Sequence, residues 1–360
     1  MQMYEDELFG TLSTTPSPEG SNMLRASLFT LIVIAQDQER IAHAQNLVHL
    51  IAQKYPCKII FIAIDSETKE SFLRRQCSHR CITEGKTSIT CDLLMIETSV
   101  EEIHKVPFLI IPELSSDQPV FLLVAHEPEE IPLVNILEPY VGRVVFEAPR
   151  VNNIGAFAAS ILALPHRAKY VDLNWAKTKP WRESLSRVFS TSEKLLHLNM
   201  SNRIDIRYSK NTDVSFERVS DAQALLLQAW LSSRLNWILV SIDEQKDHIH
   251  IKYTKDNKPF SVVLFPTDNN IMEEGSITSI EIAGENEVHY LLSYEQDDRH
   301  IAVHASTHDR CEMPYTLFVG SFQKGRALAS EIFQQAMSEQ YLPSLKVLSS
   351  TAWQKKRASI

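Results

Sequence analysis

Two uninterrupted apolar runs, each about the length of a strand, constrain the fold of this chain more than any other feature. The first is Leu28–Ala35 and the second is Cys57–Ile64. Between them, Asp37 opens an amphipathic helical pattern that Tyr55-Pro56 stops. A continuous apolar run indicates a strand that is covered on both faces. The pattern therefore predicts a β-α-β unit whose strands pair in parallel through a right-handed crossover.

The alternation of strands and helices continues through the first half of the chain. Strand-like runs follow at Cys91–Thr98, Pro119–Ala125 and Arg143–Glu147, and an apolar helix is expected at Asn152–Leu164. The intervening stretch Ser66–Thr90 is polar and rich in turn-forming residues. Such alternation predicts an α/β fold, with a parallel or mixed sheet flanked by helices.

The second half has a different period. Short runs such as His248–Tyr253 and His300–Ala305 alternate apolar and polar residues, which predicts antiparallel strands with one wet face. A helix is expected over Ala222–Leu235, and a closing helix over Arg326–Gln340 is expected to pack on this second sheet. The second half is thus predicted to be an α+β fold, a mostly antiparallel sheet packed with helices.

These patterns divide the chain into four parts. We expect a mobile tail over residues 1–23, an α/β domain over 24–167, an α+β domain over 168–345 and a C-terminal tail over 346–360. A chain of 360 residues is long enough for two domains that each bury a core.

Charge and hydropathy indicate a cytoplasmic protein. The net charge of -9 argues against a nucleic-acid surface or an anionic membrane as partner. The longest apolar runs fall far short of the roughly 20 residues that a membrane helix needs. Glu5, Asp6 and Glu7 stand where a signal peptide would carry basic and then apolar residues.

No catalytic apparatus is evident in the sequence. The turn after the first strand reads Ala35-Gln36-Asp37-Gln38, without the glycines that cradle a phosphate, and its aspartate would repel one. The chain has nine glycines in all and no nucleophile elbow. We therefore expect no enzyme activity, no cofactor and no metal site.

Three cysteines form a candidate redox site. Cys77 and Cys81 are separated by three residues, and Cys91 follows ten residues later. Nearby basic residues at Arg74 and Arg80 would lower a thiol pKa. Zinc binding and unreactive loop thiols are the alternatives, and the spacing is a poor match to zinc sites.

The stretch Tyr170–Phe189 lies where the two patterns meet. Pro180 opens a helix in which Trp181, Leu185 and Val188 form one apolar stripe. Trp175 and Trp181 are interpreted as core anchors, and Trp181 and Arg182 as partly exposed interface residues, and both interpretations can hold together.

The tryptophan and arginine motifs resemble those of a known family. Asp172-Leu173-x-Trp175, Pro180-Trp181-Arg182 and Trp230-Leu231-x-x-Arg234-Leu235-x-Trp237 are similar to motifs of the glucose-6-phosphate dehydrogenase assembly proteins of the OpcA type. Tyr55-Pro56-Cys57-Lys58 before a strand also resembles the first half of that family.

The resemblance implies a non-catalytic, allosteric activator of the pentose phosphate pathway. Such a protein binds glucose-6-phosphate dehydrogenase and promotes its active oligomer. The alternative is a small-molecule binding protein or enzyme that uses the carboxyl ends of the first sheet for a sugar phosphate or nucleotide. The partner-binding residues that the resemblance implies are Asp172, Trp175, Pro180, Trp181, Arg182, Trp230 and Arg234.

Overall fold

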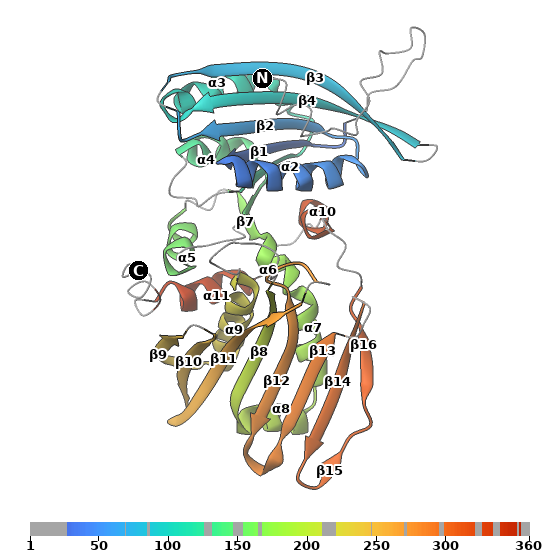
Figure 1. The fold of residues 1–360 in the computed structure, drawn as a ribbon, viewed down its shortest axis with the longest axis vertical. Coiled ribbons are helices and arrows are strands. Elements are labelled where there is room, and N and C mark those ends of the chain that lie inside the picture. The colour runs from blue at the N-terminus through green and yellow to red at the C-terminus, as the bar shows by residue number, and fades with distance from the viewer. Residues whose placement is uncertain are drawn as a thin grey trace. The chain divides into compact units, whose positions relative to one another are not determined.

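The structure is a computed structural model. It describes residues 27–68, 70–84, 87–125, 132–146, 154–164, 168–210, 221–245, 247–269, 272–294, 299–320, 326–333, 339–350 and 353. These residues form two compact units, which are taken in turn (Figure 1). The tail expected over residues 1–23 lies outside the described residues, and so does most of the tail expected over 346–360.

The first unit holds the described residues within Met1–Ala148, Leu164–Leu173 and Gln323–Met337. Its sheet has the strand order β3-β4-β2-β1-β5-β6-β7, and all neighbours are parallel except β3 and β4. The predicted β-α-β unit and mixed sheet are confirmed. The strands are β1 (Thr30–Gln36), β2 (Lys58–Asp65), β3 (Leu73–Glu84), β4 (Thr87–Ser99), β5 (Val120–Val124), β6 (Arg143–Phe146) and β7 (Lys169–Asp172).

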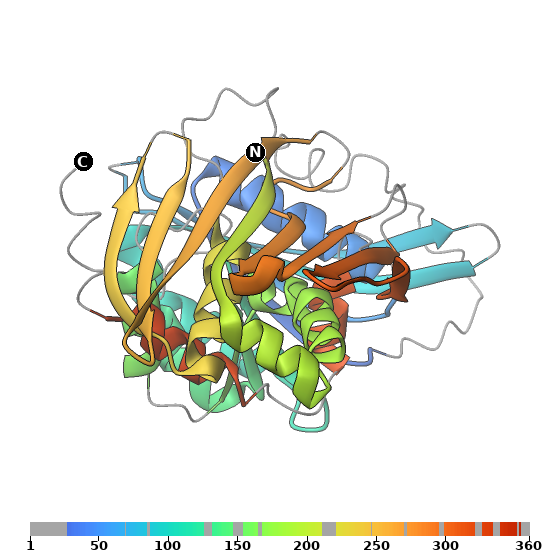
Figure 2. The ribbon, with the colours of Figure 1, turned by 90° about the horizontal axis from the view of Figure 1, so that it is seen from below.

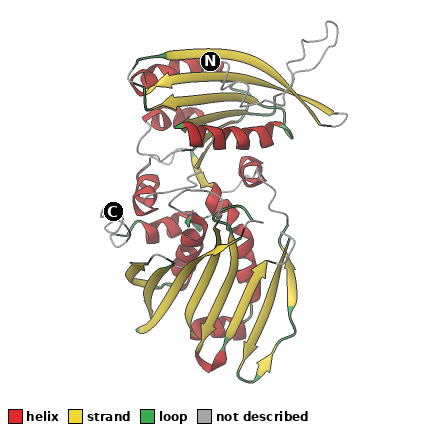
Figure 3. Cartoon of the chain, viewed as in Figure 1, coloured by secondary structure: helices red, strands yellow, loops and turns green. Residues whose placement is uncertain are grey.

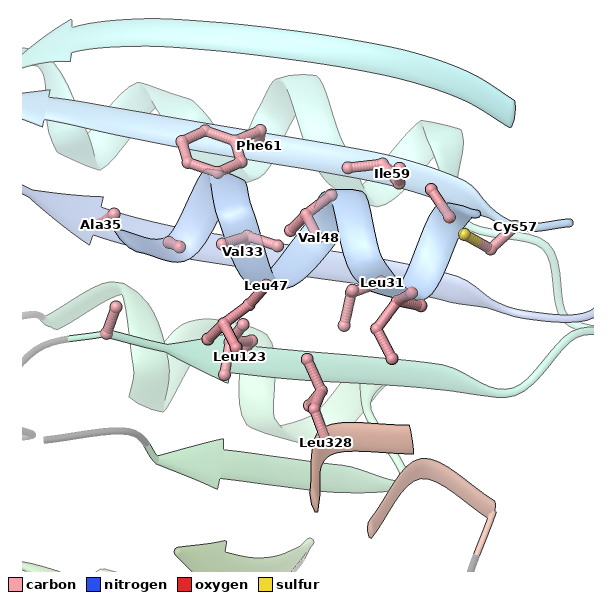
Figure 4. Packing of buried hydrophobic residues seen from close by; sticks show 14 of the residues in the cluster. Leu31, Val33, Ala35, Leu47, Val48, Cys57, Ile59, Phe61, Leu123 and Leu328 are labelled. Atoms are coloured by element: carbon pink, nitrogen blue, oxygen red, sulfur yellow. The ribbon is translucent and has the colours of Figure 1, made fainter. Parts of the chain in front are cut away.

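Helices cover this sheet because its strands are apolar on both faces. Helix α2 (Gln38–Ala52) packs Leu47 and Val48 onto the face that carries Val33 and Phe61 (Figure 4). The remaining short helical segments of this unit follow β4 and β5. They are η1 (Val100–Lys105), α3 (Val106–Ile110), η2 (Ile111–Glu113), α4 (Pro132–Leu137) and η4 (Glu138–Tyr140).

The polar stretch Ser66–Thr90 contains a strand that the sequence pattern does not reveal. β3 pairs antiparallel with β4 from Leu73↔Thr98 to Glu84↔Thr87, and the hairpin projects past the other strands (Figure 1). An edge strand of this kind buries little, so polar residues such as Arg74 and Arg75 are tolerated and the apolar alternation is lost.

The expected closing helix belongs to the first unit, which corrects its predicted position on the second sheet. Helix α10 (Arg326–Phe333) places Leu328 and Ile332 in the same core as α2. The Arg143 side chain on β6 donates to the backbone carbonyl of Glu331, and its Nη1 lies 3.4 Å from the Glu331 Oε2. The Phe333 ring packs against the ring of Phe29 with centroids 5.8 Å apart.

The second unit holds the described residues within Pro149–Ala163, Asn174–Phe322 and Ser338–Ile360. Its nine-stranded sheet has the order β15-β14-β13-β12-β8-β11-β10-β9, with β16 paired to β14. The prediction of a mostly antiparallel sheet is confirmed, and β8 and β11 form the parallel pair. The strands are β8 (Ser201–Lys210), β9 (Ile238–Glu244), β10 (Ile249–Lys255), β11 (Lys258–Asp268), β12 (Ile277–Gly284), β13 (His289–Tyr294), β14 (His300–Thr307), β15 (Arg310–Cys311) and β16 (Tyr315–Phe318).

Helices lie along one face of the second sheet (Figures 2 and 3). The Trp181 ring of α7 meets the Tyr294 ring of β13 edge to face, and the other face of the sheet exposes charged residues such as Arg203 and Lys252. The helices of this unit are α5 (Ile154–Ala163), α6 (Leu173–Lys177), α7 (Lys179–Val188), α8 (Ser192–Met200), α9 (Ala222–Leu235), η5 (Glu285–Glu287) and α11 (Tyr341–Leu348).

Candidate functional site

The motif of residues 170–189 spans the point where the chain passes from one unit to the other. Tyr170 to Asp172 belong to β7 of the first sheet, and the second unit begins at Asn174. Pro180 occupies the first turn of α7, where its missing N–H costs nothing. The predicted helix and its apolar stripe are therefore present.

Arg182 is held against Trp175 by several contacts. Its guanidinium carbon lies 3.8 Å from the centroid of the Trp175 ring, and its Nε donates to the Thr178 Oγ1 at 3.0 Å. The Thr178 hydroxyl in turn donates to the carbonyl of Trp175 at 2.8 Å. A cation over an aromatic face stabilises both groups when they are shielded from water. Arg182 is thus half-buried and fixed in place by α6.

The tryptophans of the motifs are core residues. Trp181 exposes 1% of its surface, and Trp175 and Trp230 are also buried. The indole N–H of Trp230 donates to the Gln340 side chain at 2.5 Å. Of the two interpretations of Trp175 and Trp181, the structure matches that of core anchors, and Trp181 is not exposed for contact.

The remaining motif residues differ in exposure. Asp172 is buried at the end of β7, and Pro180 is half-buried. Arg234, in the last turn of α9, is exposed. Of the seven implied partner-binding residues, only Arg234 is exposed.

Exposed apolar side chains that the sequence patterns do not single out follow Arg234 closely in the chain. Helix α9 ends at Asn236 in a left-handed conformation with φ 54, and β9 starts two residues later. Ile238 and Val240 on β9 are 69% and 58% exposed. We call Arg234, Asn236, Ile238 and Val240 the α9–β9 surface. Arginine beside exposed apolar side chains is typical of protein interfaces.

β9 is the outer strand of its sheet and pairs with β10. The register shifts between Lys252 and Tyr253 of β10, which leaves Val240 without an opposite residue. Such a bulge increases the local twist and disfavours uncontrolled strand addition at an edge. The side chains of the α9–β9 surface, more than its backbone, are therefore suited to recognition.

The carboxyl end of the first sheet is the second place where a ligand could bind. The strand order reverses between β1 and β5, where open α/β sheets place their ligands. Asp37 stands there with φ 66 and ψ 148, a conformation that favours glycine. Its carboxylate accepts from the Ser66 hydroxyl at 2.5 Å. A carboxylate at this helix N-terminus repels a phosphate group.

The candidate redox cysteines are not brought together. Cys77 is exposed and lies opposite Leu94 in the β3–β4 ladder, whereas the buried Cys91 lies opposite Arg80. Adjacent positions of a strand point to opposite faces, so Cys77 and Cys91 face away from one another. The side chain of Cys81 lies outside the described part of the structure.

The described residues contain no group of three or more histidine, cysteine, aspartate or glutamate side chains that could hold a metal ion. Within those same residues, no helix has both the length and the apolar character that crossing a membrane requires.

Part of the second half of the chain is similar to a known protein family. Residues 168–337 match a family that is described as the C-terminal domain of a glucose-6-phosphate dehydrogenase subunit. A "Putative OxPP cycle protein OpcA" from Synechocystis sp. is 24% identical over 200 residues, which cover 54% of this chain and 40% of that protein. The protein of the same name from Synechococcus elongatus is 23% identical over 251 residues, which cover 67% of this chain and 54% of that protein.

The chain thus aligns with about half the length of the curated relatives it matches. A solved structure of a mutant 3-ketoreductase from Actinomadura kijaniata, in complex with TDP-benzene and NADP, has a TM-score of 0.50 at 9% identity and covers 91% of this chain and 96% of that chain. This likeness concerns the fold alone. The resemblance that the tryptophan and arginine motifs carry is confirmed by the family match and the curated relatives.

Proposed function

We propose, from its similarity to the OpcA-type proteins, that this chain binds glucose-6-phosphate dehydrogenase and promotes its active oligomer without catalysing a reaction itself. The observation that carries the proposal is the family match over residues 168–337, which contain every one of the tryptophan and arginine motifs. In this proposal the chain acts in the cytoplasm as part of the oxidative pentose phosphate pathway. No nucleic acid or membrane takes part.

Activation of this kind needs no chemistry in the activator. A protein that binds the active oligomer of an enzyme more tightly than the inactive form shifts the population toward the active form. The size of the shift is set by the ratio of the two affinities. Exposed side chains on a rigid scaffold are sufficient, and the buried Trp175, Trp181 and Trp230 supply that rigidity in the second unit.

We place the contact at the α9–β9 surface. Arg234 belongs to a motif of the family resemblance and is exposed, and Ile238 and Val240, which follow it in the chain, are apolar and exposed. Residues of these types in a desolvated centre carry much of the binding free energy in protein interfaces. Arg182 is the second candidate for a contact, although its guanidinium already lies on Trp175.

The first sheet gives less support to the alternative, a sugar-phosphate or nucleotide site. Its strand order would suit a dinucleotide, but the turn after β1 holds Asp37, whose carboxylate would face the phosphates. A thermal unfolding titration with NADP and with glucose 6-phosphate tests this alternative. A saturable rise in the unfolding temperature would restore it.

The test of the proposal is the activity of the same organism's glucose-6-phosphate dehydrogenase, titrated with this protein. We expect activation by the wild type and at least a tenfold higher midpoint with Ile238→Lys or Arg234→Ala. Two matched controls should leave the midpoint unchanged. Phe318→Lys changes a residue that is 65% exposed on β16, and Arg187→Ala changes an exposed arginine in the last turn of α7.

The outcomes separate the function from the location of the contact. If the controls impair activation as much as Ile238→Lys and Arg234→Ala do, or if no variant impairs it, the contact lies outside the α9–β9 surface. If the wild type binds the dehydrogenase without activating it, the protein is a partner but not an activator. Absence of both binding and activation would overturn the proposal.

A further inference from the structure

Two buried thiols lie side by side in the first unit. Cys57 directly precedes β2, and Cys91 is a residue of β4, which pairs in parallel with β2 from Lys58↔Asp92 onward. Continuing this register by one residue places Cys57 opposite Cys91. Both are free cysteines, and they expose 1% and 2% of their surfaces. Both belong to the core that also contains Leu31 and Val48 (Figure 4).

The Cys91 thiol faces the segment that leads into Cys57. Its Sγ donates to the carbonyl oxygens of Ala52 and Tyr55, each at 3.9 Å. Neighbouring strands are about 4.8 Å apart, which is within the range of about 4.4 to 6.8 Å that separates the Cα atoms of a disulfide. A link between the two residues is therefore compatible with the usual spacing of neighbouring strands.

We propose that Cys57 and Cys91 are a modification site, a dithiol that a peroxide converts to a disulfide. In the first step the Cys91 sulfur attacks a peroxide oxygen, the O–O bond breaks, and water leaves as Cys91 becomes a sulfenic acid. In the second step the Cys57 sulfur attacks the Cys91 sulfur, the S–S bond forms, and a second water leaves. Two thiols lose two electrons and two protons, and one hydrogen peroxide is reduced to two waters.

In this proposal Cys91 is the attacking residue and Cys57 the resolving one. The Cys91 thiol contacts the backbone carbonyls of Ala52 and Tyr55, on the segment just before Cys57.

This pair differs from the group expected from the sequence. Cys77 and Cys91 face away from one another, whereas Cys57, which is 34 positions before Cys91, lies opposite it. The proposal concerns the first unit alone and stands independently of any dehydrogenase.

The experiment uses the full chain with Cys77→Ser, Cys81→Ser and Cys311→Ser, so that Cys57 and Cys91 are the remaining thiols. The folded protein is treated with hydrogen peroxide, unfolded in an alkylating agent and weighed by mass spectrometry. We expect loss of both alkylation sites, a mass lower by two hydrogen atoms, a linked peptide that contains both residues, and reversal by dithiothreitol. The oxidised protein should unfold several degrees higher, because the link constrains the unfolded chain.

Two further samples keep the result interpretable. In the same background, Cys57→Ser should leave Cys91 alkylatable or singly oxidised and give no linked peptide. Peroxide treatment in urea should give the link more slowly, since the sheet no longer holds the sulfurs together. The proposal is overturned if both thiols of the folded protein remain alkylatable after an exposure that oxidises Cys77 of the parent chain, or if Cys91 proceeds to sulfinic acid without a link.

Discussion

The outer strands of the two sheets, β3 in the first unit and β9 in the second, expose different chemistry. β3 carries Arg74 and Arg75, which pair with Glu97 and Glu113 at 3.8 and 2.5 Å. β9 exposes Ile238 and Val240. Charged side chains at an edge discourage the addition of another chain, whereas exposed apolar ones favour contact. The difference is one of surface chemistry, with charged pairs along the β3 edge of the first sheet and exposed apolar side chains along the β9 edge of the second.

The largest effect is expected from a substitution on α10, which tests whether this helix completes the core of the first unit. Leu328→Ala on α10 should cost about 2 to 5 kcal/mol of unfolding free energy, because it leaves a cavity in the core. The amides of β1 should then exchange faster while those of β8 are unchanged. Leu345→Ala on α11 should do the reverse, since Leu345 is buried in the second unit. If the amides of β1 exchange at the same rate in Leu328→Ala as in the wild type, α10 does not stabilise that core.

A smaller effect is expected at the end of the first sheet where a ligand would bind. The Asp37→Gly variant should be about 1 kcal/mol more stable than the Asp37→Ala variant. The reason is that the backbone conformation at position 37 is strained for any residue that carries a side chain. Both Asp37→Gly and Asp37→Ala lose the hydrogen bond from Ser66, so their difference in urea denaturation isolates the strain. A more stable alanine variant would mean that the backbone relaxes.

The smallest effect concerns Glu113, the carboxylate that pairs with Arg75 of the edge strand β3. The hydrogen bond from Lys58, followed by the charges of Lys58 and Arg75, lowers the pKa of the Glu113 carboxyl from its usual 4.5. A lowered pKa in the folded state stabilises the protein above pH 4.5, and this contribution is lost as the pH falls through the folded value.

The contribution of this partly exposed group should be below about 1 kcal/mol. Glu113→Gln should therefore be slightly less stable than the wild type at pH 7, and the difference should shrink toward pH 3. Glu183→Gln on the surface of α7 is the control. A difference that stays constant with pH would show that the charge of Glu113 is not its cause.

The sequence predicted those elements whose residues are apolar at a regular period. β1 and β2 follow from uninterrupted apolar runs, and α7 follows from Pro180 and the stripe at Trp181, Leu185 and Val188. β3 was missed because an edge strand of Arg74, Arg75 and Gln76 has no such period. α10 was predicted as a helix, but its partner was not, since an apolar stripe does not specify which core receives it.

The candidate site was predicted only in part. The motifs imply both Arg234 and Trp181 as partner-binding residues, but Trp181 is buried. The sequence does not distinguish the two, because burial of a tryptophan depends on the fold. Ile238 and Val240 were missed because an exposed edge strand and a buried one have the same apolar pattern. The pairing of Cys57 with Cys91 depends on strand order, which residue spacing does not give.

The position of α10 has a consequence for biosynthesis. The first unit draws on Met1–Ala148 and Leu164–Leu173 and then on α10 from Arg326, so roughly 150 residues after Leu173 are synthesised before the first unit can complete its core. At the usual rate of about 5 to 20 residues per second, the ribosome needs about 8 to 30 s for that stretch. During that time the apolar face that receives Leu328 stays open on the nascent chain, and a chaperone that binds such surfaces has its target there.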